Sequence, residues 1–176
     1  QAMSKFLQNL TGRKFRLIAC GSITEAVHHA DIVITATAAK KRQSLLNIDE
    51  IAPGTFIHAM GGDCPGKTEL YVDFLKHVKV VVEYKPQTLI EGEIQQCPAN
   101  LIYAELWELV CKRKPGRQDD REIILFDSVG FALEDFSILR VVYELAKEYQ
   151  LGTELLLIPE PKAPKNLFGL LEISRH

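Results

Sequence analysis

Residues 55–70 read TFIHAMGGDCPGKTEL, a short apolar run that passes directly into glycines, a proline and charged side chains. The apolar run predicts a buried parallel strand. In an open α/β sheet, ligands bind beyond the carboxyl ends of the strands, which is where the polar half of this segment falls. Gly61 and Gly62 allow close approach of a ligand to the backbone, or dihedral angles closed to other residues. Asp63 then supplies an acid and Lys67 a base, so the segment contains parts of a catalytic site.

Local physics alone leaves a second interpretation open. Clusters of Gly, Pro and Asp are ordinary turn chemistry, so the segment could be a strand-to-helix turn that Asp63 caps. Under both interpretations Pro65-Gly66 forms a tight turn between Asp63 and Lys67.

Apolar runs alternate with helical patterns along the rest of the chain. The clearest strand is 31–38, whose small, hydroxyl-bearing end leaves room for a flat ligand and lets Thr37 bond to a ribose or phosphate. Further strands are predicted at 15–19, 78–83, 122–126 and 155–158, and helices at 2–10, 22–29, 71–77, 103–111 and 131–149. This alternation predicts an α/β, Rossmann-like parallel sheet with helices on both faces.

The predicted sheet lacks the usual beginning of a dinucleotide-binding fold. No G-x-G-x-x-G occurs, and no strand-turn-helix opens the chain. In the usual strand order 3-2-1-4-5-6, two missing strands would separate the strand at 15–19 from the strand at 31–38. We therefore expect an incomplete sheet without its first βαβ unit, in a chain that is a piece of a longer protein.

Composition excludes several kinds of partner. The 176 residues suggest one domain, and 47% hydrophobic with 25% charged residues is typical of a globular protein. A net charge of −2 predicts no nucleic-acid partner, and the basic run at 112–117 is interpreted as a solvated loop. No apolar run reaches the ~18 residues of a membrane span, so no membrane partner is expected.

Cysteine and histidine spacing predicts no metal. The four cysteines form no CxxC pair, and free thiols indicate a reducing compartment, hence a cytoplasmic protein. His28 and His29 are adjacent near a predicted helix end, where exposure or the helix dipole explains them better than metal binding.

Three further interpretations concern packing. Leu106, Trp107 and Val110 have helical spacing and are expected to pack in the core. Glu91 and Glu93 are expected to be solvated on a surface turn. Asp127 is expected to be structural.

Three segments resemble the ornithine cyclodeaminase and mu-crystallin family. They are GGDCPGKTEL at 61–70, VEYKPQTLIEGEIQQ at 82–96 and FDSVGFALEDF at 126–136, and they occur in the family's order. The resemblance runs from about residue 11 to residue 157. The first segment resembles the catalytic loop of the ornithine cyclodeaminases.

The resemblance implies an NAD-dependent lyase that converts L-ornithine to L-proline and ammonia, with hydride passing to NAD and returning. It also implies a homodimer in the full-length protein. Residues 1–150 would be an incomplete NAD-binding Rossmann-like domain, and residues 151–176 would return to a substrate and dimerisation domain absent from this chain. The phosphate-binding glycines, the ribose-binding acid and the substrate-clamping basic residues are also absent. We therefore expect this piece to be inactive alone and to bind neither NAD nor ornithine well.

The same resemblance assigns roles to residues. Asp63 would be the catalytic general base and acid on the substrate's amino groups, and Val129 would contact the substrate. The expected cofactor-binding residues are Thr37, Met60, Gly61, Gly62, Asp63, Lys67 and Ser128.

Two other functions stay open. The chain could belong to an NAD(P)-dependent imine reductase or amino-acid dehydrogenase of the same family, or to a non-catalytic, mu-crystallin-like binding protein. Asp63 argues against a pure binder, which needs no carboxylate at the nicotinamide. The continuation Cys64-Pro65-Gly66-Lys67 resembles the cyclodeaminases more than the other branches.

Overall fold

The computed structural model describes residues 2–37, 42, 44–153 and 155. The chain divides into two compact units, Gln1–Phe131 and Ala132–His176, and each is described by itself. The first unit holds a five-stranded sheet, and the second holds the long helix α6 (Ala132–Glu148).

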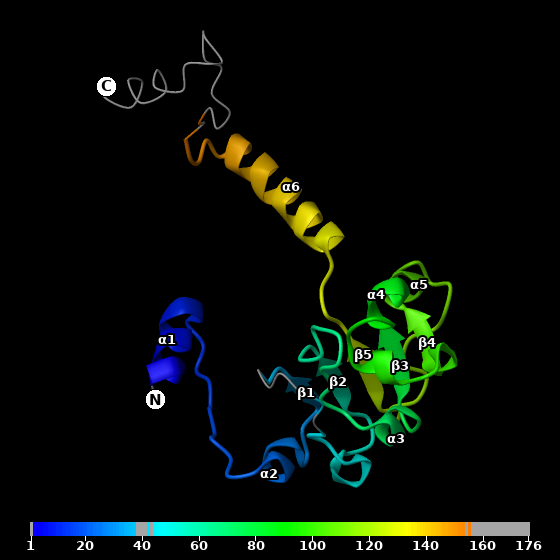
Figure 1. Cartoon of the computed structure of the whole chain (residues 1–176). Helices are drawn as coiled ribbons and strands as arrows, with labels where there is room; N and C mark the ends of the chain where they lie inside the picture. The colour runs from blue at the N-terminus through cyan, green and yellow to red at the C-terminus, as the bar shows by residue number, and fades with distance from the viewer. Residues whose placement is uncertain (1, 38–41, 43, 154, 156–176) are drawn as a thin grey trace, which may run out of the picture. The chain divides into compact units, whose positions relative to one another are not determined.

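The five strands of the sheet are all parallel (Figure 1). They are β1 (Ile32–Thr35), β2 (Phe56–Ala59), β3 (Lys79–Val82), β4 (Ile102–Glu105) and β5 (Ile124–Asp127). A parallel sheet with helices in its connections is the Rossmann-like α/β class that the sequence predicts.

The strand order places three loops together. The order is β1-β2-β5-β3-β4. The last strand in sequence, β5, therefore lies between β2 and β3, whereas strands 4, 5 and 6 of the usual dinucleotide fold are adjacent in sequence order. Thr35, Ala59 and Asp127 are level with one another in the register. The loops after β1, β2 and β5 therefore leave the same carboxyl edge side by side.

The core lies against one face of this sheet. Ile57, Val80 and Leu125 are fully buried, and each such side chain contributes about 1.5–3 kcal/mol relative to exposure. Successive strand residues point to opposite faces, and on the other face Ile32 and Ile34 are 64% and 60% exposed. The same buried cluster includes Val27, Val33, Leu46, Ile51, Ala59, Leu70, Phe74, Leu75, Val82 and Ile94.

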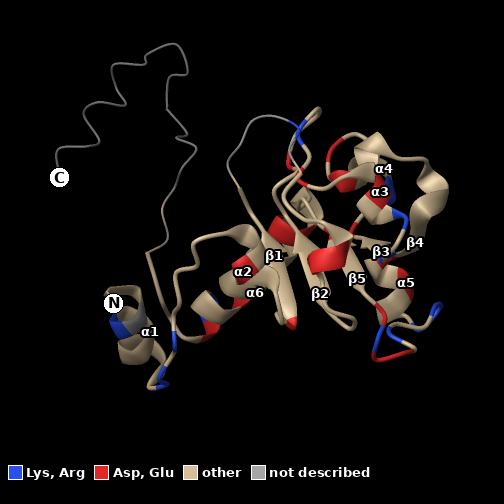
Figure 2. Ribbon diagram, turned by 90° about the horizontal axis from the view of Figure 1, so that it is seen from below, with Lys and Arg blue, Asp and Glu red and all other residues tan. Residues whose placement is uncertain are grey.

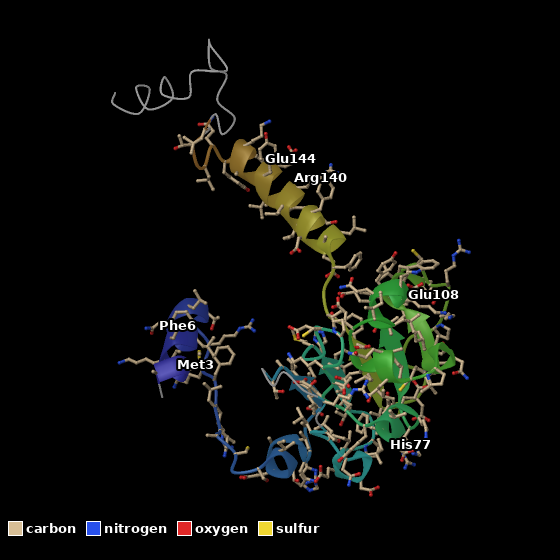
Figure 3. The ribbon with its side chains drawn as sticks, in the orientation of Figure 1. Met3, Phe6, His77, Glu108, Arg140 and Glu144 are labelled. Carbon is tan, nitrogen blue, oxygen red and sulfur yellow. The ribbon has the colours of Figure 1, made fainter. Side chains whose placement is uncertain are left out.

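The remaining elements are mostly short. They are the helices α1 (Ala2–Thr11), α2 (Ile23–Val27), α3 (Val72–Leu75), α4 (Lys85–Thr88) and α5 (Leu106–Val110), and the 3-10 turns η1 (Ile48–Glu50), η2 (Glu93–Gln96) and η3 (Ala99–Leu101). The helices predicted at 2–10, 22–29 and 71–77 are confirmed as α1, α2 and α3. Hydrophobic side chains of α1 such as Met3 and Phe6 are each 60% exposed (Figure 3).

Ser22 caps the N-terminus of α2. The Ser22 hydroxyl accepts a hydrogen bond from the Glu25 backbone N–H at 3.1 Å, as an N-cap does. The Glu25 carboxylate bonds to the N–H of Gly21 at 2.8 Å, one residue before the position that completes a capping box.

Two predictions of local structure are wrong. Residues 15–19 form no strand, because a strand needs a paired neighbour and none of the described strands pairs with them; Leu17 and Ile18 are 53% and 64% exposed. Residues 103–111 are not one helix, because pairing with β3 draws Ile102–Glu105 into β4 and α5 begins only at Leu106. The prediction that Leu106, Trp107 and Val110 pack in the core is consequently wrong, because all three are exposed.

The second unit contains α6, which confirms the long helix predicted at 131–149. None of its described residues is buried within that unit, and the labelled Arg140 and Glu144 are both exposed (Figure 3). The strand predicted at 155–158 lies outside the described residues, apart from Leu155. Among the described residues, no helix combines the length and apolar character needed to cross a bilayer.

Acidic and basic residues are both spread along the chain (Figure 2). The basic residues Lys112 and Arg113 lie in an exposed loop after α5, which also carries Asp119 and Asp120. All four cysteines are free. Within the described part of the chain, no group of three or more His, Cys, Asp or Glu side chains is placed to hold a metal ion.

Candidate functional site

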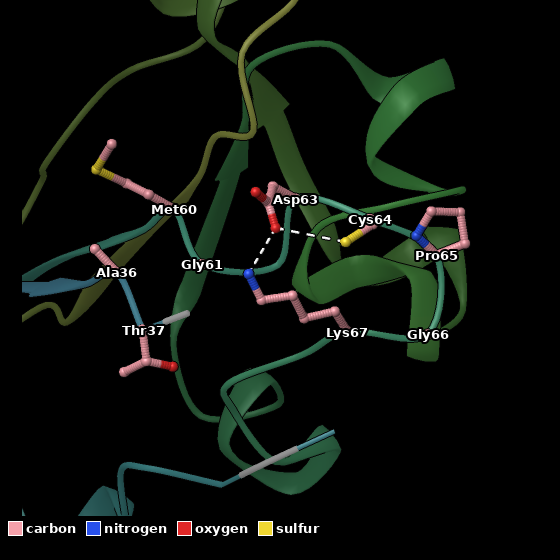
Figure 4. Close-up of a pocket in the computed structure, with 9 residues that line it drawn as sticks. All are labelled: Ala36, Thr37, Met60, Gly61, Asp63, Cys64, Pro65, Gly66 and Lys67. Carbon is pink, nitrogen blue, oxygen red and sulfur yellow. Dashed lines mark hydrogen bonds and ion pairs between the residues drawn. The ribbon is translucent and has the colours of Figure 1, made fainter. Parts of the chain in front are cut away.

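A pocket of about 750 Å³ lies at the carboxyl edge of the sheet (Figure 4). It is built from the loop after β1 and the loop after β2. Its lining residues are Ala36, Thr37, Met60, Gly61, Asp63, Cys64, Pro65, Gly66 and Lys67. Five of the seven residues expected to bind a cofactor therefore share one pocket, and Gly62 and Ser128 do not line it.

Asp63 and Lys67 form an ion pair on this pocket, with Lys67 Nζ 2.7 Å from Asp63 Oδ1 (Figure 4). The Asp63 side chain is 57% exposed, whereas that of Lys67 is only 10% exposed. The hydrogen bond from Lys67 lowers the pKa of Asp63, and the same bond raises the pKa of Lys67. The pair therefore presents an ionised carboxylate over a buried ammonium, and such a carboxylate accepts protons or binds a cationic group.

The turn between the two charged residues sets their spacing. Gly66 has a φ of 82°, which favours glycine, and the Lys67 N–H bonds to the Cys64 carbonyl at 3.1 Å. Pro65-Gly66 thus forms the tight turn predicted from sequence.

The close approach at Gly61 is to the protein's own Glu69. A Cβ added to Gly61 would lie 1.9 Å from the Glu69 carboxyl carbon. At Gly62 an added Cβ would lie 3.1 Å from the Gly92 carbonyl carbon, and the Gly92 N–H bonds to the Gly62 carbonyl at 2.5 Å. Both glycines therefore admit neighbouring segments of the fold, and Gly61 in addition lines the pocket.

Glu69 determines what Thr37 can offer to a ligand. Its Oε1 accepts the Thr37 N–H at 2.7 Å and also the Thr37 hydroxyl. Because a carboxylate only accepts, the hydroxyl proton of Thr37 is committed to Glu69. The Thr37 oxygen is left as an acceptor, which suits a ribose hydroxyl or an amide N–H and excludes the phosphate alternative.

Ser128 and Val129 follow β5 at the same edge of the sheet but outside the pocket. The Ser128 N–H bonds to the Ala59 carbonyl at 3.1 Å, and its hydroxyl donates to Glu83 at 3.1 Å. Glu83 also accepts the Gly130 N–H at 2.8 Å. Glu83 therefore holds the whole loop, and both Ser128 and Val129 are half-buried.

Sequence reasoning missed a set of buried carboxylates behind the pocket. Glu69, Glu93 and Asp127 are 1%, 0% and 2% exposed. Asp127 accepts the N–H groups of Glu93 and Ile94 at 2.9 and 3.1 Å, and also the Thr88 hydroxyl. Glu93 in turn accepts the N–H groups of Glu69 and Leu70 at 2.7 and 2.9 Å.

These carboxylates connect β5 to the pocket loops in one series. The solvated position expected for Glu93 is wrong, because its two oxygens satisfy buried backbone donors that have no other partner in a loop. The structural role expected for Asp127 agrees with its contacts. Long loops need hydrogen-bond acceptors for their buried backbone N–H groups, and this need was the available signal. No local sequence pattern identifies which carboxylate accepts those bonds.

Glu93 makes folding stability pH-dependent. Burial raises its pKa from 4.5 to about 8, against the opposing effect of the hydrogen bonds from Glu69 and Leu70. Between these two values the folded state keeps a proton that the unfolded chain has lost. The contribution of Glu93 to the free energy of unfolding is therefore fully present below pH 4.5 and is lost as the pH rises to about 8.

We expect the unfolding free energy of the wild type, relative to Glu93→Gln, to fall between pH 4.5 and 8. Comparing the two proteins cancels the titration of groups that do not interact with Glu93. Urea unfolding at several pH values measures the difference. A difference that stays flat across this window would show that Glu93 titrates with an ordinary pKa.

Comparison with known proteins identifies the family of the chain. The family model "Ornithine cyclodeaminase/mu-crystallin family" matches residues 1–150. Ornithine cyclodeaminase of Brucella melitensis is 49% identical over 171 residues, which cover 97% of this chain. The chain spans about half the length, 48%, of that relative.

Two solved structures have the same fold. The Delta(1)-pyrroline-2-carboxylate reductase of Thermococcus litoralis, in complex with NADH and L-proline, is 31% identical with a TM-score of 0.75. The alignment covers 88% of this chain and 49% of the reductase. An archaeal alanine dehydrogenase dimer with bound NAD is 30% identical with a TM-score of 0.73, over 87% of this chain and 48% of that one. By its match over residues 1–150 and its identity to the Brucella enzyme, this chain belongs to the ornithine cyclodeaminase/mu-crystallin family.

Proposed function

We propose that the chain forms the nicotinamide side of the active site in an enzyme that converts L-ornithine to L-proline and ammonia. The observation that carries this proposal is the exposed Asp63 carboxylate, paired with Lys67 on a pocket at the carboxyl edge of a parallel sheet. The 49% identity to the Brucella melitensis ornithine cyclodeaminase supports the choice of reaction.

The described residues fit the nicotinamide end of NAD. The pocket volume of about 750 Å³ leaves room for a flat ring and its ribose. Thr37 offers an acceptor to a ribose hydroxyl, and the pocket wall at Met60 and Gly61 leaves space for the ring. When bound, NAD supplies the chemistry of taking a hydride from the substrate α-carbon and returning it.

Asp63 would move the protons of the reaction. Its Oδ1 is occupied by Lys67 and by the Cys64 thiol at 3.6 Å, which leaves Oδ2 for the substrate. An ionised carboxylate there attracts the substrate ammonium, accepts a proton from an amino group and returns it to departing ammonia. Lys67 keeps Asp63 ionised between these steps.

A reductase or amino-acid dehydrogenase reaction is the second candidate. The observation favouring it is the fold shared with the reductase and the alanine dehydrogenase at 31% and 30% identity. Both reactions would use the same pocket, so the products distinguish them. A non-catalytic binding protein, as mu-crystallin-like members can be, is the third candidate and gives no product.

The test is to incubate the full-length protein with L-ornithine and NAD. We expect proline and ammonia without net NADH, because the hydride returns to the product. Steady production of NADH would instead support the dehydrogenase reaction. Binding of NAD with no turnover would contradict an enzymatic function.

Replacing Lys67 with Ala should weaken NAD affinity by about tenfold, the value of one charge-assisted contact. It should also move the acid limb of the turnover profile to higher pH, because Lys67 is the largest cause of the lowered Asp63 pKa. Fluorescence titration with NAD and a pH–rate profile measure the two effects.

The matched control is Lys76→Ala. Lys76 also pairs with a nearby carboxylate, Asp73 at 3.2 Å, but both are exposed and outside the pocket. An NAD dissociation constant unchanged in Lys67→Ala would remove Lys67 from the cofactor site.

The family of the chain also supports proposals on the domain organisation, assembly and location of the full-length protein. We propose that residues 1–150 belong to the NAD-binding domain and that 151–176 return to a substrate and dimerisation domain. The likeness to an alanine dehydrogenase dimer supports a homodimer in the full-length protein. The four free thiols support a cytoplasmic location.

A further inference from the structure

One amide side chain holds the turn between Asp63 and Lys67. The Gln95 Oε1 accepts the Gly66 N–H at 2.6 Å. Its Nε2 donates to the carbonyls of Lys67 and Cys64 at 2.8 and 3.3 Å. Gln95 belongs to η2, about thirty residues further along the chain, and does not line the pocket.

The neighbours of Gln95 fix its own position. Its Nε2 also lies 2.8 Å from the Gly92 carbonyl, so its two hydrogens are shared among three carbonyls, and this contact ties the side chain to its own turn. Glu93, two residues before it, is anchored to β5 by Asp127. The η2 turn is therefore a fixed support, and Gln95 extends from it to the turn that carries the ion pair.

The other contacts of η2 reach the ends of the pocket loop. Gly92 bonds to Gly62 before the turn, and Glu93 bonds to Glu69 and Leu70 after it. Among the described residues, Gln95 makes the only side-chain hydrogen bonds to the backbone of residues 64–67. This amide therefore adds three contacts to the backbone that spaces Asp63 from Lys67, beside the turn's own bond from the Lys67 N–H to the Cys64 carbonyl.

Glutamine suits this place chemically. The turn presents one N–H donor and two carbonyl acceptors, and an amide side chain offers an acceptor and two donors. A carboxylate of the same length would meet the two carbonyls without a donor. An apolar side chain of the same length would take this partner from the Gly66 N–H and the Lys67 carbonyl, whereas the Cys64 carbonyl would keep its bond from the Lys67 N–H.

We propose that Gln95 is a positioning residue for the active site, acting through the 64–67 turn to hold Lys67 against Asp63. This inference rests on the proposed function for its effect on turnover. It adds a residue that touches neither the pocket nor, by its placement, the reacting atoms.

The test compares Gln95→Met and Gln95→Ala with the wild type in the full-length protein. Methionine keeps the length of the glutamine side chain but cannot make its hydrogen bonds. If the alanine variant fails to fold, the methionine variant is measured alone. The control is Gln118→Ala, because Gln118 is exposed and its side chain makes no hydrogen bond among the described residues.

Two readouts are needed. Turnover of ornithine should fall by roughly tenfold to a hundredfold in the Gln95 variants, as expected when a catalytic group is displaced by about 1 Å. The Asp63 carboxyl resonance, followed by carbon-13 NMR during a pH titration, should titrate at higher pH because Lys67 no longer holds it. Gln118→Ala should match the wild type in both.

Unchanged titration of Asp63 in folded Gln95 variants would overturn the proposal. The NMR readout does not depend on the reaction. A wild type that makes no proline would refute the proposed function alone, and the titration would still decide the role of Gln95.

Discussion

Asp63→Asn in the full-length enzyme should bind NAD normally and lose most of its turnover, by about 10²–10⁴-fold, the usual contribution of a positioned acid or base. Asparagine has the same shape but cannot accept a proton, and it gives up the ion pair with Lys67. Asp63 is 57% exposed, so the folded state should be nearly as stable as the wild type. Proline formation and an NAD titration measure the two effects separately.

Asp73→Asn is the matched control for this variant. Asp73 pairs with Lys76 in an exposed position on α3, outside the pocket, so its loss should leave turnover unchanged. If Asp63→Asn turned over ornithine at the wild-type rate, Asp63 would have no part in the mechanism.

Gly61→Ala should destabilise the protein by about 3 kcal/mol, the cost of losing hydrogen bonds to a buried charged group. The new Cβ would overlap the Glu69 carboxylate, whose nearest atom lies 1.9 Å away. Glu69 is 1% exposed and bonded to Thr37, so moving aside breaks those bonds. Urea unfolding should show the loss, and NAD affinity should fall with it because Thr37 is released.

Gly116→Ala is the control for this substitution. A Cβ at Gly116 meets nothing within 4 Å, so its stability should stay within about 0.5 kcal/mol of the wild type. Equal stability of Gly61→Ala and Gly116→Ala would mean that Glu69 moves freely, which would contradict the rigid arrangement behind the pocket.

The main strands and the pocket loop could be predicted from sequence because their signals are local. Apolar runs mark β1, β2, β3 and β5, and the Pro65-Gly66 turn follows directly from residue type. The same holds for the parallel arrangement, which alternation of strands and helices requires. Residues 15–19 have a strand-like pattern too, but joining a sheet is a long-range property, and none of the strands β1 to β5 includes them.

The supports of the site could not be predicted because they join segments far apart in the chain. Glu93 contacts a backbone 24 residues earlier, and Asp127 one 34 residues earlier. Sequence spacing alone therefore made Glu93 resemble a solvated residue. Gln95 could not be identified from sequence either, because the role of its amide depends on Gly66 lying beside it in the folded chain.

The candidate site was partly predictable. Thr37, Gly61, Asp63 and Lys67 meet in one pocket, as parallel strand ends require. The direction of the Thr37 hydrogen bond depends on Glu69, which sequence did not connect to it. Ser128 reaches the same edge, but Glu83 holds it away from the pocket lining.

A crystal structure of the full-length protein with bound NAD would test the central claim most directly. We expect the nicotinamide to lie in the pocket between Thr37 and Asp63, with the Thr37 hydroxyl oxygen accepting a hydrogen bond from the ligand. Nicotinamide bound elsewhere in the protein, with this pocket empty, would contradict the assignment of Asp63 and Lys67 to the chemistry.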